Sequence, residues 1–266
     1  MTSLSTHGSA TNRNKIIWML ILFMVIEKVL ENGVLVPAIL KMPFGDLTSN
    51  LLYKGIEVLL VLGLNYWLVK QKLYFSFALN FKTIIFMVGG IGYISLFIHS
   101  GSVKFLFPTL GLALLTAISE ELLYRGVIFV DLLKILTARH ASGLNIITAV
   151  IVSSLLFSLQ HLSNLASQSW LATGCQLIQT FGMGVLFAAV YLRTSSLSLV
   201  IFTHFIIDFP MIYLSQISVA ASRSAGIETQ PSVLGSIIVA CLYVICGIII
   251  FHSHLKDRLV KALNKS

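Results

Sequence analysis

Residues 233–252 read VLGSIIVACLYVICGIIIFH, a stretch without a single charged side chain. An α-helix rises about 1.5 Å per residue, so this stretch is long enough to cross the roughly 30 Å hydrocarbon core of a bilayer. Similar apolar windows occur upstream, at roughly 16–38, 50–69, 83–99, 105–124, 146–163, 170–192 and 196–216. The sequence therefore predicts about eight transmembrane helices.

The composition supports a membrane protein. Of the 266 residues, 57% are hydrophobic and 11% are charged, a balance that leaves too little polar surface to cover a soluble domain. The apolar runs are continuous and do not alternate with polar residues, which favours helices over barrel strands. We predict an all-α, polytopic helical bundle with one domain at 15–255, a disordered tail at 1–14 and a basic cytoplasmic tail at 256–266.

The net charge of +8 comes from Lys and Arg residues scattered between apolar runs. They form no basic face, so we expect no nucleic-acid partner and membrane lipid instead. If the amino terminus is cytoplasmic, only Lys41, Lys104 and Arg223 fall clearly outside. The positive-inside rule then predicts a multi-pass protein with both termini in the cytoplasm.

The first apolar window contains three charged residues, Glu27, Lys28 and Glu31. The two glutamates are four residues apart, so they share one helix face. They have no histidine nearby to complete a ligand set. A solvated or lysine-paired helix end therefore explains them better than a functional site, and we leave them out of the site.

Charged residues within an apolar span are costly and are therefore functional candidates. The window 105–124 ends in Ser119-Glu120-Glu121-Leu122-Leu123-Tyr124-Arg125. Glu121 and Arg125 have the i, i+4 spacing of an ion pair, whereas Glu120 points about 100° away around the helix. Glu120 is thereby left free for chemistry. A surface salt bridge at a helix end would explain Glu121 and Arg125 but not a second acid.

Two further motifs lie on other apolar windows. One runs from Phe157 to His161, and the other contains His204 and Asp208 at i, i+4 spacing. With Glu120, these residues supply a carboxylate base, two imidazoles and a second carboxylate, the groups needed to activate water and stabilise an oxyanion. The chain contains neither a GxSxG nucleophile motif nor HExxH. Peptide hydrolysis fits this inventory.

In this order, the motifs EExxxR, FxxxH and HxxxD resemble the CPBP family of intramembrane proteases. That family includes type II CAAX prenyl endopeptidases and bacteriocin-processing or bacteriocin-immunity proteins. The resemblance covers residues 105–210 well. It implies a water-accessible cavity in which Glu120 acts as general base, with a site completed by His161, His204 and Asp208. It also implies a structural or substrate-orienting role for Glu121 and Arg125, with Phe157 packed beside the cavity.

The family is usually classed as a metalloprotease family. The residues leave open whether zinc is bound or glutamate works with histidine alone. Two imidazoles and one or two carboxylates would suit zinc. The candidate ligands would be His161, His204, Asp208 and Glu120.

The resemblance also leaves the biological role open between peptide processing and bacteriocin self-immunity, in the plasma membrane of a bacterium. We expect the substrate to be a small membrane-associated peptide or protein, which could be a bacteriocin. A non-catalytic immunity protein is one alternative, and a proton- or ion-coupled transporter is another, although no inverted repeat is visible.

Two geometric expectations remain to be compared with the structure. Counting residues along each window places Glu120 and His204 at shallow depth but His161 nearer the outer face. Either tilt or a cytoplasmic extension of the fourth helix through Lys134 would reconcile these depths. The glycines 89, 90, 182 and 184 would allow close helix approach around the cavity, or ordinary packing elsewhere.

Overall fold

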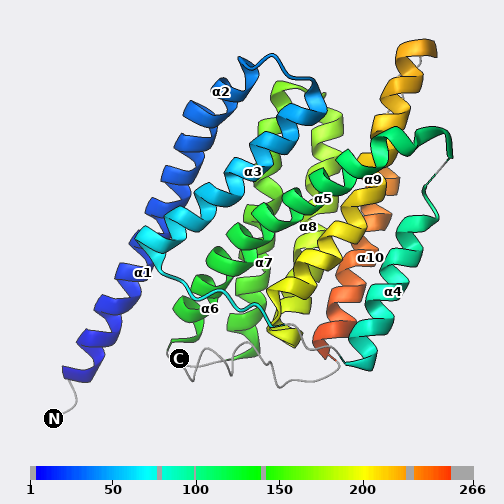
Figure 1. Ribbon diagram of the computed structural model, residues 1–266. Coiled ribbons are helices and arrows are strands. Elements are labelled where there is room, and N and C mark those ends of the chain that lie inside the picture. Colours follow the sequence, from blue (N-terminus) through cyan, green and yellow to red (C-terminus); the bar gives the residue numbers. More distant parts are fainter. Residues whose placement is uncertain (1–3, 77–79, 99, 139–141, 226–230, 253–266) are drawn as a thin grey trace.

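The computed structural model describes residues 4–76, 80–98, 100–138, 142–225 and 231–252. All regular elements in these ranges are helices (Figure 1). The elements are α1 (Leu4–Leu30), η1 (Glu31–Leu35), α2 (Val36–Leu40), α3 (Asp46–Leu64), η2 (Asn65–Val69), α4 (Phe81–Ser95), η3 (Ser100–Phe105), α5 (Leu106–Glu121), η4 (Leu122–Phe129), α6 (Val130–Thr137), α7 (Gly143–Leu159), η5 (Gln160–Ala166), α8 (Trp170–Thr194), α9 (Leu197–Ala225) and α10 (Val233–His252). Of the short elements, η1, η2 and η4 are π-helical, whereas η3 and η5 are 3-10 helices.

The prediction of an all-α polytopic bundle is confirmed. Within the described residues, 6 helices are long and apolar enough to cross a membrane. Two predicted windows fall outside that set. Residues 16–38 form a helix that contains three charged side chains, and residues 83–99 correspond to the shorter α4, which spans 15 residues. The predicted count of eight is therefore approximate.

We expected a disordered tail over residues 1–14, of which the structure describes residues 4–14. Helix α1 begins at Leu4 and runs without a break into the apolar stretch. Once the apolar stretch has nucleated a helix, each further residue adds a hydrogen bond at little cost, so the helix extends into the polar segment. The predicted basic tail, 256–266, lies outside the described residues.

Side-chain caps set where several helices begin. Ser142 accepts a hydrogen bond from the amide of Asn145 at the start of α7, and Ser169 accepts one from Ala172 at the start of α8. Each hydroxyl satisfies an amide that has no partner within the first helical turn. These polar residues follow the ends of apolar runs, so they mark the boundaries between successive spans.

Helix α8 packs against both α7 and α10, while α5 packs against α3 and α9 (Figure 1). Two glycines on α8 permit its close contacts. A Cβ atom on Gly182 would lie 2.7 Å from the carbonyl oxygen of Ala240 in α10, and one on Gly184 would lie 2.8 Å from Cβ of Ser154 in α7. Close approach is thus confirmed for Gly182 and Gly184. A Cβ atom on Gly90 would lie 3.0 Å from the ring of Phe202 in α9, whereas Gly89 faces open space.

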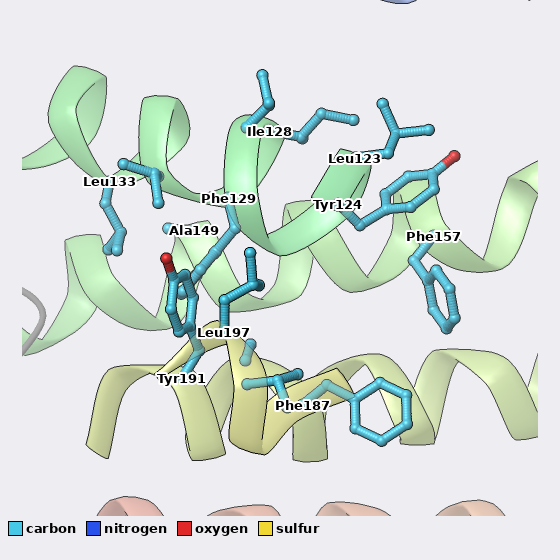
Figure 2. Packing of buried hydrophobic residues seen from close by; sticks show 14 of the residues in the cluster. Leu123, Tyr124, Ile128, Phe129, Leu133, Ala149, Phe157, Phe187, Tyr191 and Leu197 are labelled. Carbon is cyan, nitrogen blue, oxygen red and sulfur yellow. The ribbon is translucent and has the colours of Figure 1, made fainter. Parts of the chain in front are cut away.

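The apolar core lies where η4 and α6 meet α7, α8 and α9. Figure 2 shows Phe129 and Leu133 from the first pair facing Ala149, Tyr191 and Leu197 from the others. All five side chains are fully buried. The outward-facing surface of the bundle carries many large exposed apolar side chains, as expected where lipid is the solvent.

Glu120 lies within one long helical stretch. The stretch Val103–Thr137 comprises 35 residues that run obliquely through η3, α5, η4 and α6 (Figure 1). At about 1.5 Å per residue this stretch is longer than the bilayer core, so it must tilt or extend beyond it. Glu120 lies near the middle of this stretch.

Candidate active site

The three sequence motifs meet at one cavity. Glu120 at the end of α5, His161 in η5, and His204 and Asp208 on α9 all line a cavity of about 340 Å³. This volume lies in the range of small-molecule and peptide sites and is large enough to hold a peptide bond with an attacking water. Phe157 also lines the cavity, as the family resemblance implied.

Glu120 is buried, but its carboxylate faces two polar partners. One oxygen, Oε2, lies 3.9 Å from Nε2 of His204. The other, Oε1, accepts a hydrogen bond of 3.3 Å from the ammonium group of Lys54. The helix changes to a π-helical stretch at Leu122, directly after the two glutamates. Such widened turns occur frequently at functional sites because they redirect neighbouring side chains.

His204 is held between two carboxylates. Its Nδ1 lies 2.7 Å from Oε1 of Glu121, and its Nε2 lies 3.0 Å from Oδ2 of Asp208. Its ring stacks on Phe187 with centroids 4.7 Å apart. An ionised carboxylate can only accept hydrogen bonds, and a neutral imidazole ring has one N–H donor. Both contacts therefore require either an imidazolium ring or one protonated carboxyl group. The ring is therefore fixed in position and orientation.

Glu121 and Arg125 form the expected i, i+4 ion pair, but through a single oxygen. The Nη1 atom of Arg125 lies 3.0 Å from Oε1 of Glu121, and its Nη2 donates to the carbonyl oxygen of Gly184 at 3.3 Å. The guanidinium carbon lies 4.2 Å from the ring centroid of Phe157. Because the Arg125 side chain is only 1% exposed, this is a core ion pair and not a surface salt bridge.

His161 lies at the change from α7 to the 3-10 helix η5. Its Nδ1 lies 3.1 Å from the carbonyl oxygen of Phe157 and 3.3 Å from that of Ser158. Carbonyl oxygens only accept hydrogen bonds, so Nδ1 carries the proton and donates it. Nε2 is left for the cavity. The ring also meets Phe157 edge to face, with centroids 5.5 Å apart.

Sequence reasoning missed the charged residues that α1, η1 and α3 contribute to this cavity. Lys28, Glu31, Lys54 and Glu57 all line it. The expected lysine pairing is present, because Lys28 bonds Glu31, but Glu27 is buried and not solvated. Lys54 and Glu57 lie inside the apolar window 50–69, so the cost of charges within a span would have identified them from the sequence.

The predicted zinc ligands were compared with the geometry that zinc requires. Ligand atoms about 2 Å from one ion must lie close to one another. Within the described residues, the group whose ligand atoms all lie within 4.8 Å is Glu27, Glu31 and Glu57. Both nitrogens of His204 already face carboxylates, one of them that of Asp208. In this arrangement the four predicted ligands do not fit a zinc ion, and zinc at this site stays a prediction.

No curated protein and no solved structure matches the chain. The scan of protein families gives a match over residues 102–210, to the Rce1-like type II CAAX prenyl endopeptidase family. That segment includes α5, η4, α7 and α8 and extends into α9. It contains all the motif residues that line the cavity. The resemblance seen in the motifs is thus confirmed over this segment, whose similarity is to a family of intramembrane CAAX-type proteases.

Proposed function

We propose that the protein is an intramembrane endopeptidase in which Glu120 activates water to hydrolyse a peptide bond. The observation that carries this proposal is the convergence of Glu120, His161 and His204 on one cavity, although they come from three separate helices. The family match over residues 102–210 supports the same reaction.

The chemistry follows from the positions of these groups. The Glu120 carboxylate takes one proton from water, and the resulting hydroxide attacks the carbonyl carbon of the scissile bond. His161, once protonated, donates from Nε2 to the carbonyl oxygen as negative charge develops there. The proton held by Glu120 then passes to the leaving nitrogen, so that one water molecule is consumed. His204 orients Glu120 from the opposite side.

The substrate that suits this site is a small membrane-associated peptide or protein. The cavity is lined by both polar and apolar groups and lies among helices whose outer faces are apolar. In a bacterial plasma membrane the activity would serve peptide processing or self-immunity toward a bacteriocin. We propose that both termini are cytoplasmic, on the basis of the distribution of basic residues.

The test uses the full-length protein in liposomes and a mixture of synthetic peptides, with cleavage followed by mass spectrometry. We expect Glu120→Gln and His161→Ala to abolish cleavage, since each removes a group that contacts the reacting atoms. Ser119→Ala is the matched control, because this buried hydroxyl bonds the carbonyl oxygen of Thr116 in its own helix. Membrane abundance must be equal for all variants.

Full cleavage by Glu120→Gln at normal abundance would overturn the proposal. A bacteriocin survival assay and a flux assay with the same variants test two alternative functions. Protection that persists in Glu120→Gln would indicate a non-catalytic immunity protein. Proton or ion flux that depends on Glu120, without any cleavage, would indicate a transporter.

A further inference from the structure

The Glu120 carboxylate has a partner that comes from outside the segment matched to the family. Lys54 lies on α3, and its ammonium nitrogen is 3.3 Å from Oε1 of Glu120 and 2.8 Å from Oε2 of Glu57. Its side chain is 15% exposed. The Lys54 ammonium group therefore contacts two carboxylates. One belongs to Glu120, and the other belongs to Glu57, which lies one helical turn after Lys54 on α3.

Glu57 belongs to a buried acidic cluster whose other members are Glu27 and Glu31 on the neighbouring α1 and η1. Two lysine ammonium groups form ion pairs with this cluster. Lys28 pairs with both glutamates of the first helix, and Lys54 pairs with Glu57. The cluster is thus better explained as an anchor for two partly buried lysines than as a separate metal site.

This anchoring fixes where the Lys54 ammonium group lies. Tyr53, the preceding residue, donates a hydrogen bond to Glu31, which ties the start of α3 to η1. The 2.8 Å contact between Lys54 and Glu57 has the length of a charge-assisted hydrogen bond, so it anchors the ammonium group. The anchored ammonium group then restricts rotation of the Glu120 carboxylate, which it contacts at 3.3 Å. On the other side, His204 lies 3.9 Å from Oε2 of Glu120. Each oxygen of Glu120 thus faces one fixed group.

We propose that Lys54 is a positioning residue that holds the Glu120 carboxylate in its attacking orientation, and that Glu57 holds Lys54 in turn. The proposal rests on the proposed hydrolytic function. Helix α3, which precedes the segment matched to the family, would then position a catalytic group of the site. Lys54 acts through Glu120, and the bound substrate needs no contact with it.

The experiment compares Lys54→Met, Lys54→Arg and Glu57→Gln in liposomes, with kcat and KM determined separately. A misplaced catalytic group costs on the order of 100-fold in rate, so we expect Lys54→Met to lower kcat by about 10- to 100-fold with KM little changed. Lys54→Arg, which keeps the positive charge, should restore most of kcat. Glu57→Gln should lower kcat less than Lys54→Met does, because the ammonium group remains.

The matched control is Lys134→Met. Lys134 also pairs with a buried acid three residues away, Asp131, but the pair lies on α6 and does not line the cavity. This variant should keep the wild-type kcat. If Lys54→Met fails to accumulate in membranes, Lys54→Arg and Glu57→Gln still test the same contact through their kcat values.

Wild-type kcat in Lys54→Met at normal abundance would overturn the inference. Equal loss of kcat and of thermal stability in Lys54→Met and Lys54→Arg would also overturn it, because a purely structural lysine would behave in this way. The experiments distinguish a failure of the positioning role of Lys54 from a failure of the hydrolytic function. If Glu120→Gln abolishes cleavage while Lys54→Met does not, only the positioning role is wrong. If Glu120→Gln itself remains active, the hydrolytic function is wrong.

Discussion

At the scale of single residues, the most demanding feature is the Arg125 guanidinium group buried in the core. It lies over the rings of Phe157 and Phe187, with its carbon 4.2 Å and 5.1 Å from their centroids. Glu121 supplies the compensating charge and also contacts His204. The ion pair therefore links the packed core to the side of the site that carries His204.

Removal of one partner of this ion pair should be strongly destabilising. We expect Arg125→Met to lower the free energy of unfolding by about 3–5 kcal/mol, because it leaves the buried Glu121 carboxylate without its guanidinium partner. The measurement is the thermal midpoint in detergent together with membrane abundance. The double variant Arg125→Met with Glu121→Gln should recover part of the loss, and additive losses would contradict this explanation.

The contact between Asp208 and His204 predicts different cleavage rates for two substitutions of Asp208. Asparagine keeps a carbonyl oxygen that can accept from Nε2 of His204, whereas alanine does not. We therefore expect Asp208→Asn to keep most of the cleavage rate and Asp208→Ala to lose about tenfold or more, as is common when a group that orients a histidine is removed. Equal activity of the two variants would show that this contact is dispensable.

Metal dependence can be decided without any substitution. Because the predicted ligands do not fit zinc as they are arranged, we expect prolonged dialysis against a chelator to leave peptide cleavage unchanged. The check is the cleavage rate before and after dialysis, with the metal content of both samples measured. Loss of activity that added zinc restores would mean that the side chains rearrange around a metal ion.

At the scale of helices, the spans from 105 onward were predictable because their apolar runs are long and carry few charges. The site residues were predictable for the same reason, since Glu120, His161 and His204 interrupt such runs. Lys54 interrupts its apolar run in the same way, which marks it as a candidate, but its contact with Glu120 could not be predicted because it matches no motif and Glu120 is 66 residues away in sequence. The packing of α3 against α5 is a tertiary contact, which local sequence patterns do not predict.

Two glycines provide a matched test of helix packing. In Gly182→Ala the new methyl group would lie 2.7 Å from the carbonyl oxygen of Ala240, so α8 and α10 must separate and the thermal midpoint should fall. In Gly89→Ala the methyl group meets nothing within 4 Å. That variant should be neutral or slightly stabilising, because alanine favours a helix over glycine by about 1 kcal/mol. Equal midpoints for the two variants would contradict the observed packing.

At the scale of the whole molecule, the cavity and the basic residues of several helix ends and connecting segments lie toward different ends of the bundle, although Lys28 and Lys54 line the cavity itself. The segment 70–76, the end of α6, the end of α8 and the start of α4 lie at the lower end of Figure 1. Their basic residues include Lys72, Lys82, Lys134 and Arg193. The 3-10 helix η5, which contributes His161 to the cavity, lies toward the opposite end. If these basic residues are cytoplasmic, as we propose from the positive-inside rule, the cavity lies toward the outer face.

This orientation predicts which side of the membrane can reach the cavity. In a cysteine-free background, Ser163→Cys places a thiol on an exposed cavity residue of η5, whereas Lys82→Cys places one at the basic end. We expect a membrane-impermeant thiol reagent to label Ser163→Cys in intact cells and Lys82→Cys only after permeabilisation. The reverse pattern would place the cavity on the cytoplasmic side. Cytoplasmic peptides would then be its substrates, and the basic residues would need an explanation other than topology.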